Sequence, residues 1–388
     1  MMIPASYTFR NVTKHKVTST LTIFGVALVV FVFAAVLMLA HGLLTTLVST
    51  GSDDNIVIIR KASQSEVTSI IMREQADIVS TFPEIKLGQD NKPLFTNELY
   101  VLISLVKRDD DGSSNVTVRG VTEKSLEMRP DIKITEGRMY KPGTAEIIAG
   151  KSIANRFKGC QVGETVRFGS RDWTVVGLFD AQGSAFDSEI WGDIEQMMDA
   201  FRRPVYSSLT MKLADPSSMS AVTSRIDADL RLQLEAKPEK EYYAAQSTAT
   251  TQFITYVGVA ICVIFSFGAI VGAMITMYAA VANRTKEIGT LRSLGFSRLS
   301  ILMTFLFEAF VISLTGGILG LVGASFLRFV EVSTVNFNTF SELAFNFRLN
   351  IPTMVVSILF AVIMGFLGGF LPAVRASRLK IVDSLRAT

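Results

Sequence analysis

The segment Asn283–Ser300, with the sequence NRTKEIGTLRSLGFSRLS, separates two long apolar runs and carries four basic residues and one acid. Its apolar residues Ile288, Leu291 and Leu294 are three or four positions apart, so they share one face of a helix. A glycine directly after the last of them favours a helix end, and the serine two positions later can cap the next helix. The segment 283–297 is therefore predicted to be a short amphipathic helix between two longer ones.

Four long apolar runs predict four membrane-spanning helices. Three of the runs contain no Asp, Glu, Lys or Arg, and the fourth contains only Glu308. Each run exceeds the roughly 20 residues that cross a bilayer core. The first is too long for the core of a signal peptide and lacks a convincing cleavage site, so we expect it to remain as an anchor. The predicted helices, including extensions beyond the bilayer, are 17–50, 246–282, 298–328 and 350–376.

The distribution of basic residues predicts the orientation of these helices. The leader 1–16, the segment 283–298 and the C-terminal tail together carry eleven Lys and Arg against two acids, whereas 51–251 carries 25 basic and 30 acidic residues. Because Lys and Arg near span ends favour the cytoplasm, we expect both termini and the short helix inside, with 51–251 and the short loop 329–349 outside. The net charge of +3 then reflects topology and does not indicate a nucleic-acid partner.

The segments that flank the membrane helices carry further predictions. The leader 1–16 is predicted to lie on the inner leaflet as an interfacial helix, and a second docking element for a cytoplasmic partner is the alternative. The tail 377–388 is predicted to continue the last helix into a basic surface segment. The first two runs exceed the thickness of a bilayer, which predicts a two-helix stalk outside it, although tilt would absorb part of the excess length.

The outer segment is predicted to be a mixed α/β core domain spanning 51–245, because apolar alternation and helical spacing both occur in it. We expect two lobes, one formed by 51–129 with 205–245 and the other by the insertion 130–204, with Gly177 ending one unit of the insertion. The predicted strands are 55–59, 99–106, 115–121, 165–168, 173–176 and 209–213. The predicted helices are 66–82, 152–157, 188–201 and 217–234.

Residue types that perform catalysis or bind metals are sparse. The two histidines, His15 and His41, are near no carboxylate cluster, which argues against a His-based catalytic site or a zinc site. Cys160 falls in the outer domain and Cys262 in the second span, so they cannot form a disulfide within one chain. We therefore predict no catalytic, cofactor or metal site on this chain and no enzymatic activity of its own.

Two motifs in the outer domain are rejected as binding sites. Asp109–Asp111 lacks the alternation and the distant Glu of a calcium loop, so we interpret it as a solvated hairpin turn. The stretch 145–152 ends in Gly-Lys-Ser like a phosphate loop, but Ala145 stands where that loop requires glycine. It also faces the side of the membrane that lacks ATP.

Small residues and one acid stand out within the spans. Glycines four residues apart allow close helix packing in lipid, and the chain has three such pairs. Glu308 is the one ionised residue predicted inside a span. We expect it to pair with a neighbouring Arg and to have a structural or transmission role, because a lone acid makes no proton relay. The predicted packing glycines are Gly268, Gly272, Gly316, Gly320, Gly365 and Gly369.

Several of these motifs resemble one family. The run Arg284-Thr-Lys-Glu-Ile-Gly-Thr-Leu-Arg-Ser-Leu-Gly295, the following Glu308 and Gly316-Gly317-x-x-Gly320, and the tail Pro372-Ala-x-Arg375-Ala are similar to the MacB/FtsX-like permeases, also called type VII ABC transporters or mechanotransmission permeases. Outside, the run from Glu146-x-x-x-Gly150 to Val175-Val176-Gly177 resembles the family's periplasmic core domain. Ile381-Val382 departs from the family, which commonly has proline before its final Leu-Arg.

The resemblance implies a permease in the inner membrane that pairs with a second permease chain, identical or different. It implies a separate ATPase subunit that holds ATP and Mg²⁺ and presses on the short helix, with a periplasmic adaptor or carrier and membrane lipid as further partners. Movement would travel along the stalk to the outer domain. The residues implied to contact the ATPase are Arg284, Lys286, Glu287, Ile288, Leu291, Arg292, Leu294 and Gly295.

Two functions remain open on this basis. The first is export or extraction of a substrate such as a lipid, lipoprotein, peptide or drug from the outer leaflet or periplasm, as the resemblance to MacB and LolC/LolE suggests. The second is an FtsX-like regulatory role, in which the same motion activates a cell-wall hydrolase. A membrane sensor would need a larger cytoplasmic part, and an intramembrane enzyme would need a nucleophile–base or metal group within the spans.

Overall fold

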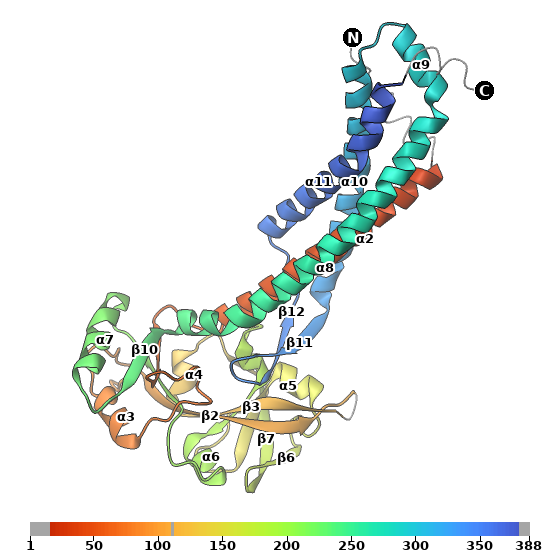
Figure 1. Ribbon diagram of the computed structural model, residues 1–388. Helices are drawn as coiled ribbons and strands as arrows, with labels where there is room; N and C mark the ends of the chain where they lie inside the picture. Colours follow the sequence, from red (N-terminus) through yellow and green to blue (C-terminus); the bar gives the residue numbers. More distant parts are fainter. Residues whose placement is uncertain (1–15, 110–111, 380–388) are drawn as a thin grey trace. The chain divides into compact units, whose positions relative to one another are not determined.

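The computed structural model describes residues 16–109 and 112–379 (Figure 1). The predicted leader helix, nearly all of the predicted basic tail and the middle of the turn at Asp109–Asp111 lie outside the described residues. The described chain divides into two compact units, and each is treated by itself. The helical unit contains residues 16–41, 253–330 and 347–379. The sheet unit contains residues 42–252 and 331–346.

Long helices form the helical unit, with the short helix α9 (Thr285–Ser293) between two of them (Figure 1). Each of the four long helices is apolar enough and long enough to cross a membrane, which confirms the predicted spans. The first two contain 33 and 45 residues, more than the roughly 20 that a bilayer core requires. The long helices are α2 (Lys16–Val48), α8 (Glu239–Asn283), α10 (Arg298–Ser325) and α11 (Ile351–Ser377).

Glycines bring three of these helices close together. A Cβ atom on Gly316 would lie 2.9 Å from the carbonyl oxygen of Ile23 on α2, and Gly320 lies one turn further along the same contact. Gly365 and Gly369 of α11 face Ser313 and Ala309 of α10 in the same way. Because a larger residue would force these helices apart, the glycines fix the spacing of α2, α10 and α11.

The third predicted glycine pair has no close neighbour in the part of the chain that the structure describes. Among the described residues, no neighbouring atom lies within 4 Å of where a Cβ on Gly268 or Gly272 would stand. Close approaches to α8 occur instead at Gly258, which faces Val36, and at Gly368 of α11, which faces Ala273. Gly268 and Gly272 therefore lie on a face of α8 that the other described helices leave uncovered, and their packing against a helix stays a prediction.

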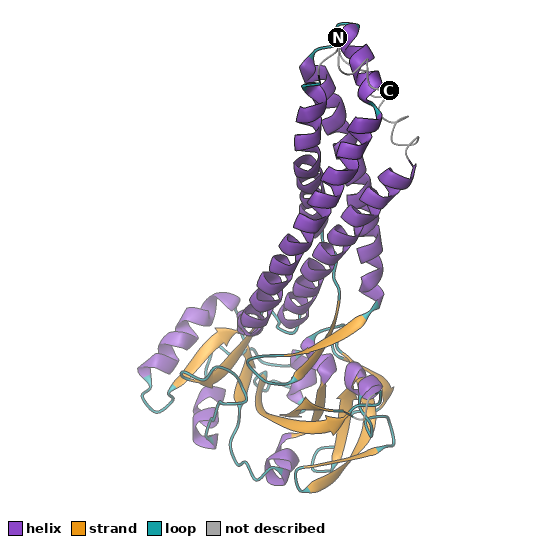
Figure 2. Cartoon of the chain, turned by 45° about the vertical axis from the view of Figure 1, so that its right-hand side comes forward, coloured by secondary structure: helices purple, strands orange, loops and turns teal. Residues whose placement is uncertain are grey.

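A ten-stranded mixed sheet forms the body of the sheet unit (Figure 2). Its pairs are antiparallel except for β3 with β8 and β5 with β7. The strands, in their order across the sheet, are β10 (Leu234–Pro238), β1 (Asn55–Arg60), β9 (Ser208–Lys212), β2 (Phe95–Val106), β3 (Ser113–Val121), β8 (Glu189–Asp193), β5 (Glu146–Gly150), β7 (Arg171–Asp180) and β4 (Lys133–Gly137), with β6 (Thr165–Phe168) also paired to β7.

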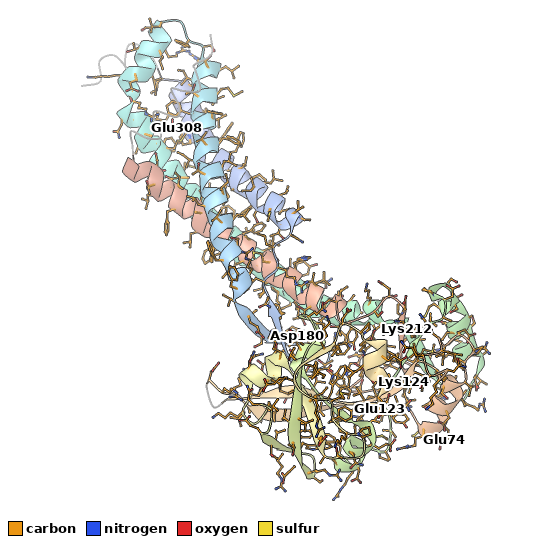
Figure 3. All side chains as sticks on the ribbon, turned by 180° about the vertical axis from the view of Figure 1, so that it is seen from behind. Glu74, Glu123, Lys124, Asp180, Lys212 and Glu308 are labelled. Atoms are coloured by element: carbon orange, nitrogen blue, oxygen red, sulfur yellow. The ribbon has the colours of Figure 1, made fainter. Side chains whose placement is uncertain are left out.

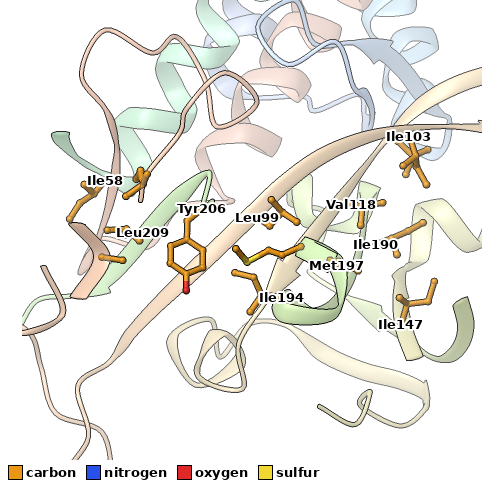
Figure 4. Packing of buried hydrophobic residues seen from close by; sticks show 14 of the residues in the cluster. Ile58, Leu99, Ile103, Val118, Ile147, Ile190, Ile194, Met197, Tyr206 and Leu209 are labelled. Carbon is orange, nitrogen blue, oxygen red and sulfur yellow. The ribbon is translucent and has the colours of Figure 1, made fainter. Parts of the chain in front are cut away.

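The two predicted lobes are adjacent halves of this sheet. Strands from 51–129 and 205–245 make one half, strands from 130–204 make the other, and β3 and β8 join them through hydrogen bonds. One hydrophobic core extends through both halves (Figure 4), so they belong to the same compact unit. The core residues labelled there are Ile58, Leu99, Ile103, Val118, Ile147, Ile190, Ile194, Met197, Tyr206 and Leu209.

Several predicted helices are shorter in the structure. The predicted helix 66–82 is helical only at α3, and 188–201 begins with the strand β8 before α6. The sequence pattern missed β8 because a strand with neighbours on both sides is set by pairing across the sheet, which overrides local spacing. The helices of this unit are α3 (Arg73–Ser80), α4 (Lys124–Met128), α5 (Lys151–Arg156), α6 (Ile194–Ala200) and α7 (Met219–Ala228), with 3₁₀ turns η1 (Ala185–Ser188) and η2 (Pro216–Ser218).

Two further expectations need correction. Gly177 does not end a strand, because it lies inside β7 at a register shift, where a Cβ atom would collide with the backbone of Arg138. The predicted loop 329–349 contains a β-hairpin, β11 (Glu331–Val335) and β12 (Glu342–Asn346), which belongs to the sheet unit although its flanking helices belong to the helical unit. The 3₁₀ turn η3 (Phe326–Phe329) connects α10 to this hairpin.

Candidate functional site: the short helix α9 and a buried charge cluster

The boundaries of α9 follow from local sequence. The helix ends before Gly295, whose φ of +94° is a conformation that other residues rarely adopt. The amides of Gly295 and Phe296 then donate to the carbonyls of Arg292 and Leu291, which satisfies the last turn. Ser297 caps α10, because its hydroxyl accepts from the amide of Ser300 at 3.1 Å. The chain therefore turns sharply from a surface helix into a membrane helix.

Only one face of α9 is exposed. Ile288 is 2% exposed and packs in an apolar cluster with residues of α8, α10 and α11, and Leu291 is half-buried beside it. Leu294, which the sequence placed on the same apolar face, is 68% exposed. Arg292 is half-buried, so it does not belong to the open face. The exposed residues of α9 and its end are Lys286, Glu287, Thr290, Ser293, Leu294 and Gly295.

Arg284, just before α9, is buried against the acid of α10. Its Nη1 and Nη2 atoms donate to the two carboxylate oxygens of Glu308 at 2.8 and 3.2 Å, and each side chain is only 6% exposed. Figure 3 labels Glu308 on its helix. The expected pairing of Glu308 with a neighbouring Arg is confirmed. Arg284 itself is not on the open face of α9, so its expected role in contacting a partner is replaced by that of an anchor for α9.

A second group of buried charges lies in the sheet unit and centres on Arg119 of β3. This side chain is fully buried, and three carboxylates surround its guanidinium. Glu66 accepts at 2.8 and 3.3 Å, Glu98 at 2.5 Å and Glu189 at 2.7 and 2.8 Å. A buried charge is tolerated only when it is paired and hydrogen-bonded. Arg119 therefore holds together β2, β3, β8 and the loop before α3.

A second arginine extends the cluster to the first residue of α8. Arg129, 5% exposed, donates to Glu98 at 2.7 Å and to Glu239 at 3.2 Å. Glu239 opens α8 and also accepts from the amide of Ser52 and the side chain of Asn55, both at 2.9 Å. The segment that follows α2, the start of α8 and the middle of the sheet are therefore bound to one another by charge-assisted hydrogen bonds.

Aromatic rings line the cluster. The guanidinium of Arg119 lies 4.9 Å from the ring centre of Tyr100, and that of Arg129 lies 4.8 Å from Phe186. The indole of Trp191 donates to Glu189 at 2.7 Å. Arginine above an aromatic face gains a cation–π interaction while the ring keeps water away. Burial also raises the pKa of Tyr100 to about 12, so its phenol stays neutral.

The carboxylates respond to this environment in opposite directions. Burial raises the pKa of Glu98, but the neighbouring Arg129 and Arg119 lower it by a larger amount. The pKa of Glu98 therefore lies below its usual value. Glu98 thus stabilises the fold above its unfolded pKa of about 4.3, and this contribution is lost as the pH falls. For Glu189, burial outweighs Arg119 and the pKa is raised. Ionisation of Glu189 therefore lowers the free energy of unfolding as the pH rises above its unfolded pKa of about 4.3.

This cluster could hardly be predicted from the order of residues along the chain. Its charged members come from six separate segments of the sheet unit. Its members share no spacing pattern along the chain, and an Arg inside the apolar strand β3 is the clearest sign of a buried charge. The members are Glu66, Glu98, Arg119, Arg129, Glu189 and Glu239. Among the described residues no group of His, Cys, Asp and Glu is arranged to hold a metal ion.

Four membrane helices, a large α/β domain inserted between the first two, and a surface helix between the second and third define a multi-pass membrane protein of the permease type. Residues 19–229 match the family model of the MacB-like periplasmic core domain, and residues 259–381 match that of the FtsX-like permease C-terminal region. The first match covers more than half of the chain. The chain therefore belongs to the family of ABC transporter permeases of the MacB/FtsX type.

Relatives of two lengths match this chain. The uncharacterized ABC transporter permease YvrN of Bacillus subtilis (strain 168) is 25% identical over 97% of this chain and 98% of its own length. The macrolide export ATP-binding/permease protein MacB of Neisseria meningitidis serogroup A is 23% identical over 96% of this chain, which spans 59% of that relative. The crystal structure of the periplasmic region of MacB from Actinobacillus actinomycetemcomitans aligns over 48% of this chain and 90% of its own, with 14% identity and a TM-score of 0.37.

Replacing Arg119 by Met should lower the free energy of unfolding of the sheet unit by about 3–5 kcal/mol, because three buried carboxylates lose their shared partner. Both tryptophans of the chain, Trp173 and Trp191, are buried in this unit. Tryptophan fluorescence of the full chain in detergent therefore follows the unfolding of this unit. Arg73→Met, which removes an exposed ion pair with Glu195, is the control and should cost less than about 1 kcal/mol. Equal losses in the two variants would contradict the role of the cluster.

Replacing Glu308 by Gln should loosen α9, because the buried Arg284 loses its counter-charge at a cost of about 3–5 kcal/mol. Tryptic cleavage after Lys286 in the full-length protein measures this opening, and we expect it to be at least about tenfold faster. Glu287→Gln removes the same charge from the open face and serves as the control. The exchange Arg284→Glu with Glu308→Arg should restore protection. Cleavage of the Glu308→Gln variant at the wild-type rate would rule out an anchoring pair.

Proposed function

We propose that this chain is the permease subunit of an ABC transporter whose ATP is hydrolysed by a separate ATPase subunit. The observation that supports this most is the form of α9, a short helix between two membrane-spanning helices with one face anchored and the other open. The anchored face transmits force, because Ile288 and Arg284 fix it to the long helices. The open face is available to a partner. ATP and Mg²⁺ would be bound by that partner, and we expect no cofactor on this chain.

The open face of α9 is chemically suited to a protein partner. Lys286 and Glu287 offer opposite charges, and Leu294 offers a large apolar side chain that is 68% exposed. Interfaces combine a buried apolar anchor with a polar rim in this way. We propose that Leu294 inserts into a pocket of the ATPase and that Lys286 and Glu287 set its orientation.

The proposed effect of ATP hydrolysis is a conformational change in the sheet unit. Helix α8 runs without a break from Glu239, in the buried charge cluster, to Asn283, beside the anchor Arg284. A helix hydrogen-bonded throughout is stiff, so displacement of α9 reaches the cluster with little loss. This arrangement supports a permease that acts by moving its outer domain.

We propose that the work done is export or extraction of a substrate from the outer leaflet or periplasm, with a lipid, lipoprotein, peptide or drug as the substrate class. The name of the Neisseria relative, a macrolide export protein, supports export. A periplasmic adaptor or carrier would receive the substrate. Purification of the full chain with its bound proteins tests this, since an adaptor supports export, whereas a cell-wall hydrolase would favour the regulatory alternative.

The charge distribution supports placement in the inner membrane with both termini in the cytoplasm. Lys and Arg are concentrated in the leader, around α9 and in the tail, whereas the segment 51–251 is net acidic. The sheet unit would then lie in the periplasm and α9 in the cytoplasm, where ATP is present.

Helix α8 provides the surface for a second permease chain. Only 17% of the most apolar 18-residue stretch of α8 is buried within the chain, whereas the corresponding stretches of the other three spans are 33–39% buried. Gly268 and Gly272 lie on it with open space around them. Because small residues four apart let two membrane helices approach closely, we propose that this face of α8 meets a second copy of the chain or a related permease.

Leu294→Asp and Lys286→Glu should each weaken binding of the ATPase subunit by at least about tenfold, since they place the wrong charge in the proposed contact. Co-purification of the ATPase with the full chain measures this. Leu294 suits the test better than Leu291, which is half-buried in the helical unit. Leu230→Asp, at a residue of the sheet unit that is 89% exposed, is the control. Wild-type recovery of the ATPase with both α9 variants would defeat the docking assignment.

Gly268→Cys should give a cross-linked dimer in membranes treated with a short bifunctional thiol reagent, because the two α8 helices meet there. The native Cys160 and Cys262, both buried, are replaced by Ala beforehand. Ile318→Cys on α10, 48% exposed, is the control for random collision in the bilayer and should remain monomeric. Equal cross-linking at the two positions, or none at Gly268, would place the dimer contact elsewhere.

A further inference from the structure

The hairpin β11–β12 forms a two-stranded sheet of its own, from Glu331 paired with Asn346 to Val335 paired with Glu342. An isolated hairpin of this size is marginally stable in water. Contacts with the rest of the sheet unit must therefore hold it. Leu343, Ala344 and Phe345 are only 4–5% exposed, so β12 is buried although the main sheet adds no strand to it.

An ion pair fixes the centre of the hairpin. Glu342 of β12, whose side chain is 3% exposed, forms an ion pair with Arg156 at the end of α5. Arg156 also donates to the hydroxyl of Ser333 on β11 at 2.5 Å, and Ser333 donates to Glu342 at 2.6 Å. Lys107 adds a second cation at 3.4 Å from Glu342. The carboxylate is thus buried between two cations, and the loss of one leaves it poorly compensated.

Further contacts come from widely separated segments of the sheet unit. The amide of Ala344 donates to the hydroxyl of Ser188 at 3.0 Å. Side-chain amides complete the attachment at the tip: that of Asn115 donates to the carbonyl of Phe340 at 3.2 Å, and that of Asn338 donates to the carbonyl of Gln246 on α8 at 2.9 Å. The hairpin is thus attached to β3, to the turn before β8 and to α8.

The hairpin also borders the buried charge cluster. One recess in the sheet unit is lined both by Glu66, Arg119 and Glu189 of the cluster and by residues of the hairpin, among them Thr339 and Glu342. A shift of the hairpin would therefore change the surroundings of the residues that hold the two halves of the sheet together. The recess itself carries no ligand assignment.

The chain connects this hairpin to α9 by a route that does not use α8. Helix α9 is followed by α10, whose Glu308 binds Arg284. Helix α10 then continues through η3 and Val330 into β11, and β12 leads to α11 after four residues. Both ends of the hairpin are therefore short connections to membrane-spanning helices.

We propose that the β11–β12 hairpin is a second transmission element, which carries the movement of α10 into the sheet unit through the Arg156–Glu342 pair. This inference rests on the proposed function and adds a route to it. Arg156 and Glu342 act as positioning residues, because they fix the hairpin to α5. Helix α8 moves the charge cluster at Glu239, while the hairpin acts on the side of the sheet unit formed by α5 and the turn before β8. The sheet unit changes fully only when both act.

The test lengthens the two connections between the hairpin and the long helices, and it leaves the contacts of the hairpin with the sheet unit in place. Four-residue Gly-Ser insertions are placed after Val330 and after Phe347 of the full chain. The chain is reconstituted in nanodiscs with the ATPase subunit that the wild-type protein binds. Hydrogen exchange of the amides of β3 and β8 is measured with and without ATP and Mg²⁺, together with the rate of ATP hydrolysis. The same insertion after Gly143, an exposed turn with open space around it, is the control.

The chain with both insertions should bind the ATPase subunit and support ATP hydrolysis like the wild type. The ATP-dependent change in hydrogen exchange should fall by at least about twofold, as expected when a coupling connection is lost. Glu342→Gln should give the same loss with the connections intact. Arg73→Gln, at an exposed ion pair distant in sequence from the hairpin, should have no effect.

The outcomes separate the two proposals. If the ATP-dependent change in hydrogen exchange is unchanged both in the chain with the two insertions and in the Glu342→Gln variant, the second route is overturned and the proposed function stays intact. The absence of any ATP-dependent change in the unmodified chain would overturn the proposed function and this inference with it. If the Gly143 insertion lowers the response as much as the paired insertions do, the loss is not specific to the hairpin and the second route is rejected.

Discussion

The structure depends on the compensation of a few charges that are removed from water. Arg119 in the middle of the sheet is fully buried, and three glutamates from separate segments satisfy its guanidinium. Removing a charge from water is costly, so the arginine constrains all three segments to one arrangement. The two halves of the sheet, which pair through β3 and β8 and through the bridge between Lys107 and Phe157, are thereby fixed more firmly to each other.

The same principle operates at both ends of α8. At its first residue, Glu239 accepts from Arg129 within the sheet unit, and just beyond its last residue, Arg284 donates to Glu308 within the helical unit. Between these ends, the apolar stretch of α8 is less buried within the chain than the apolar stretches of the other three spans. A stiff element held by buried ion pairs at both ends and exposed along its middle is suited to transmit displacement. The exposed middle is suited to meet another chain.

The other two long helices reach the sheet unit by a different connection. Helices α10 and α11 are spaced by glycines against each other, and α10 is spaced in the same way against α2. The β11–β12 hairpin connects α10 to α11. That hairpin is held by the buried carboxylate of Glu342 between two cations. Helix α9 is joined by short connections to both α8 and α10, so a movement of α9, as proposed above, would act on two chain segments at once. Under the proposed function, the sheet unit would therefore respond to two inputs instead of one.

The sequence alone determined the features that arise from local composition. Apolar runs without charges specified the four spans, and Gly295 with Ser297 specified where α9 ends and α10 begins, because helix ends are satisfied by residues a few positions away. Tertiary structure decided the rest. It made β8 a strand where spacing indicated helix, and it placed Gly268 on a face of α8 that no other described helix covers. It also assembled the cluster of Arg119 from residues as far apart in the chain as Glu66 and Glu239. The partners of a buried charge depend on which residues lie beside it in the folded chain, and no local sequence pattern specifies them.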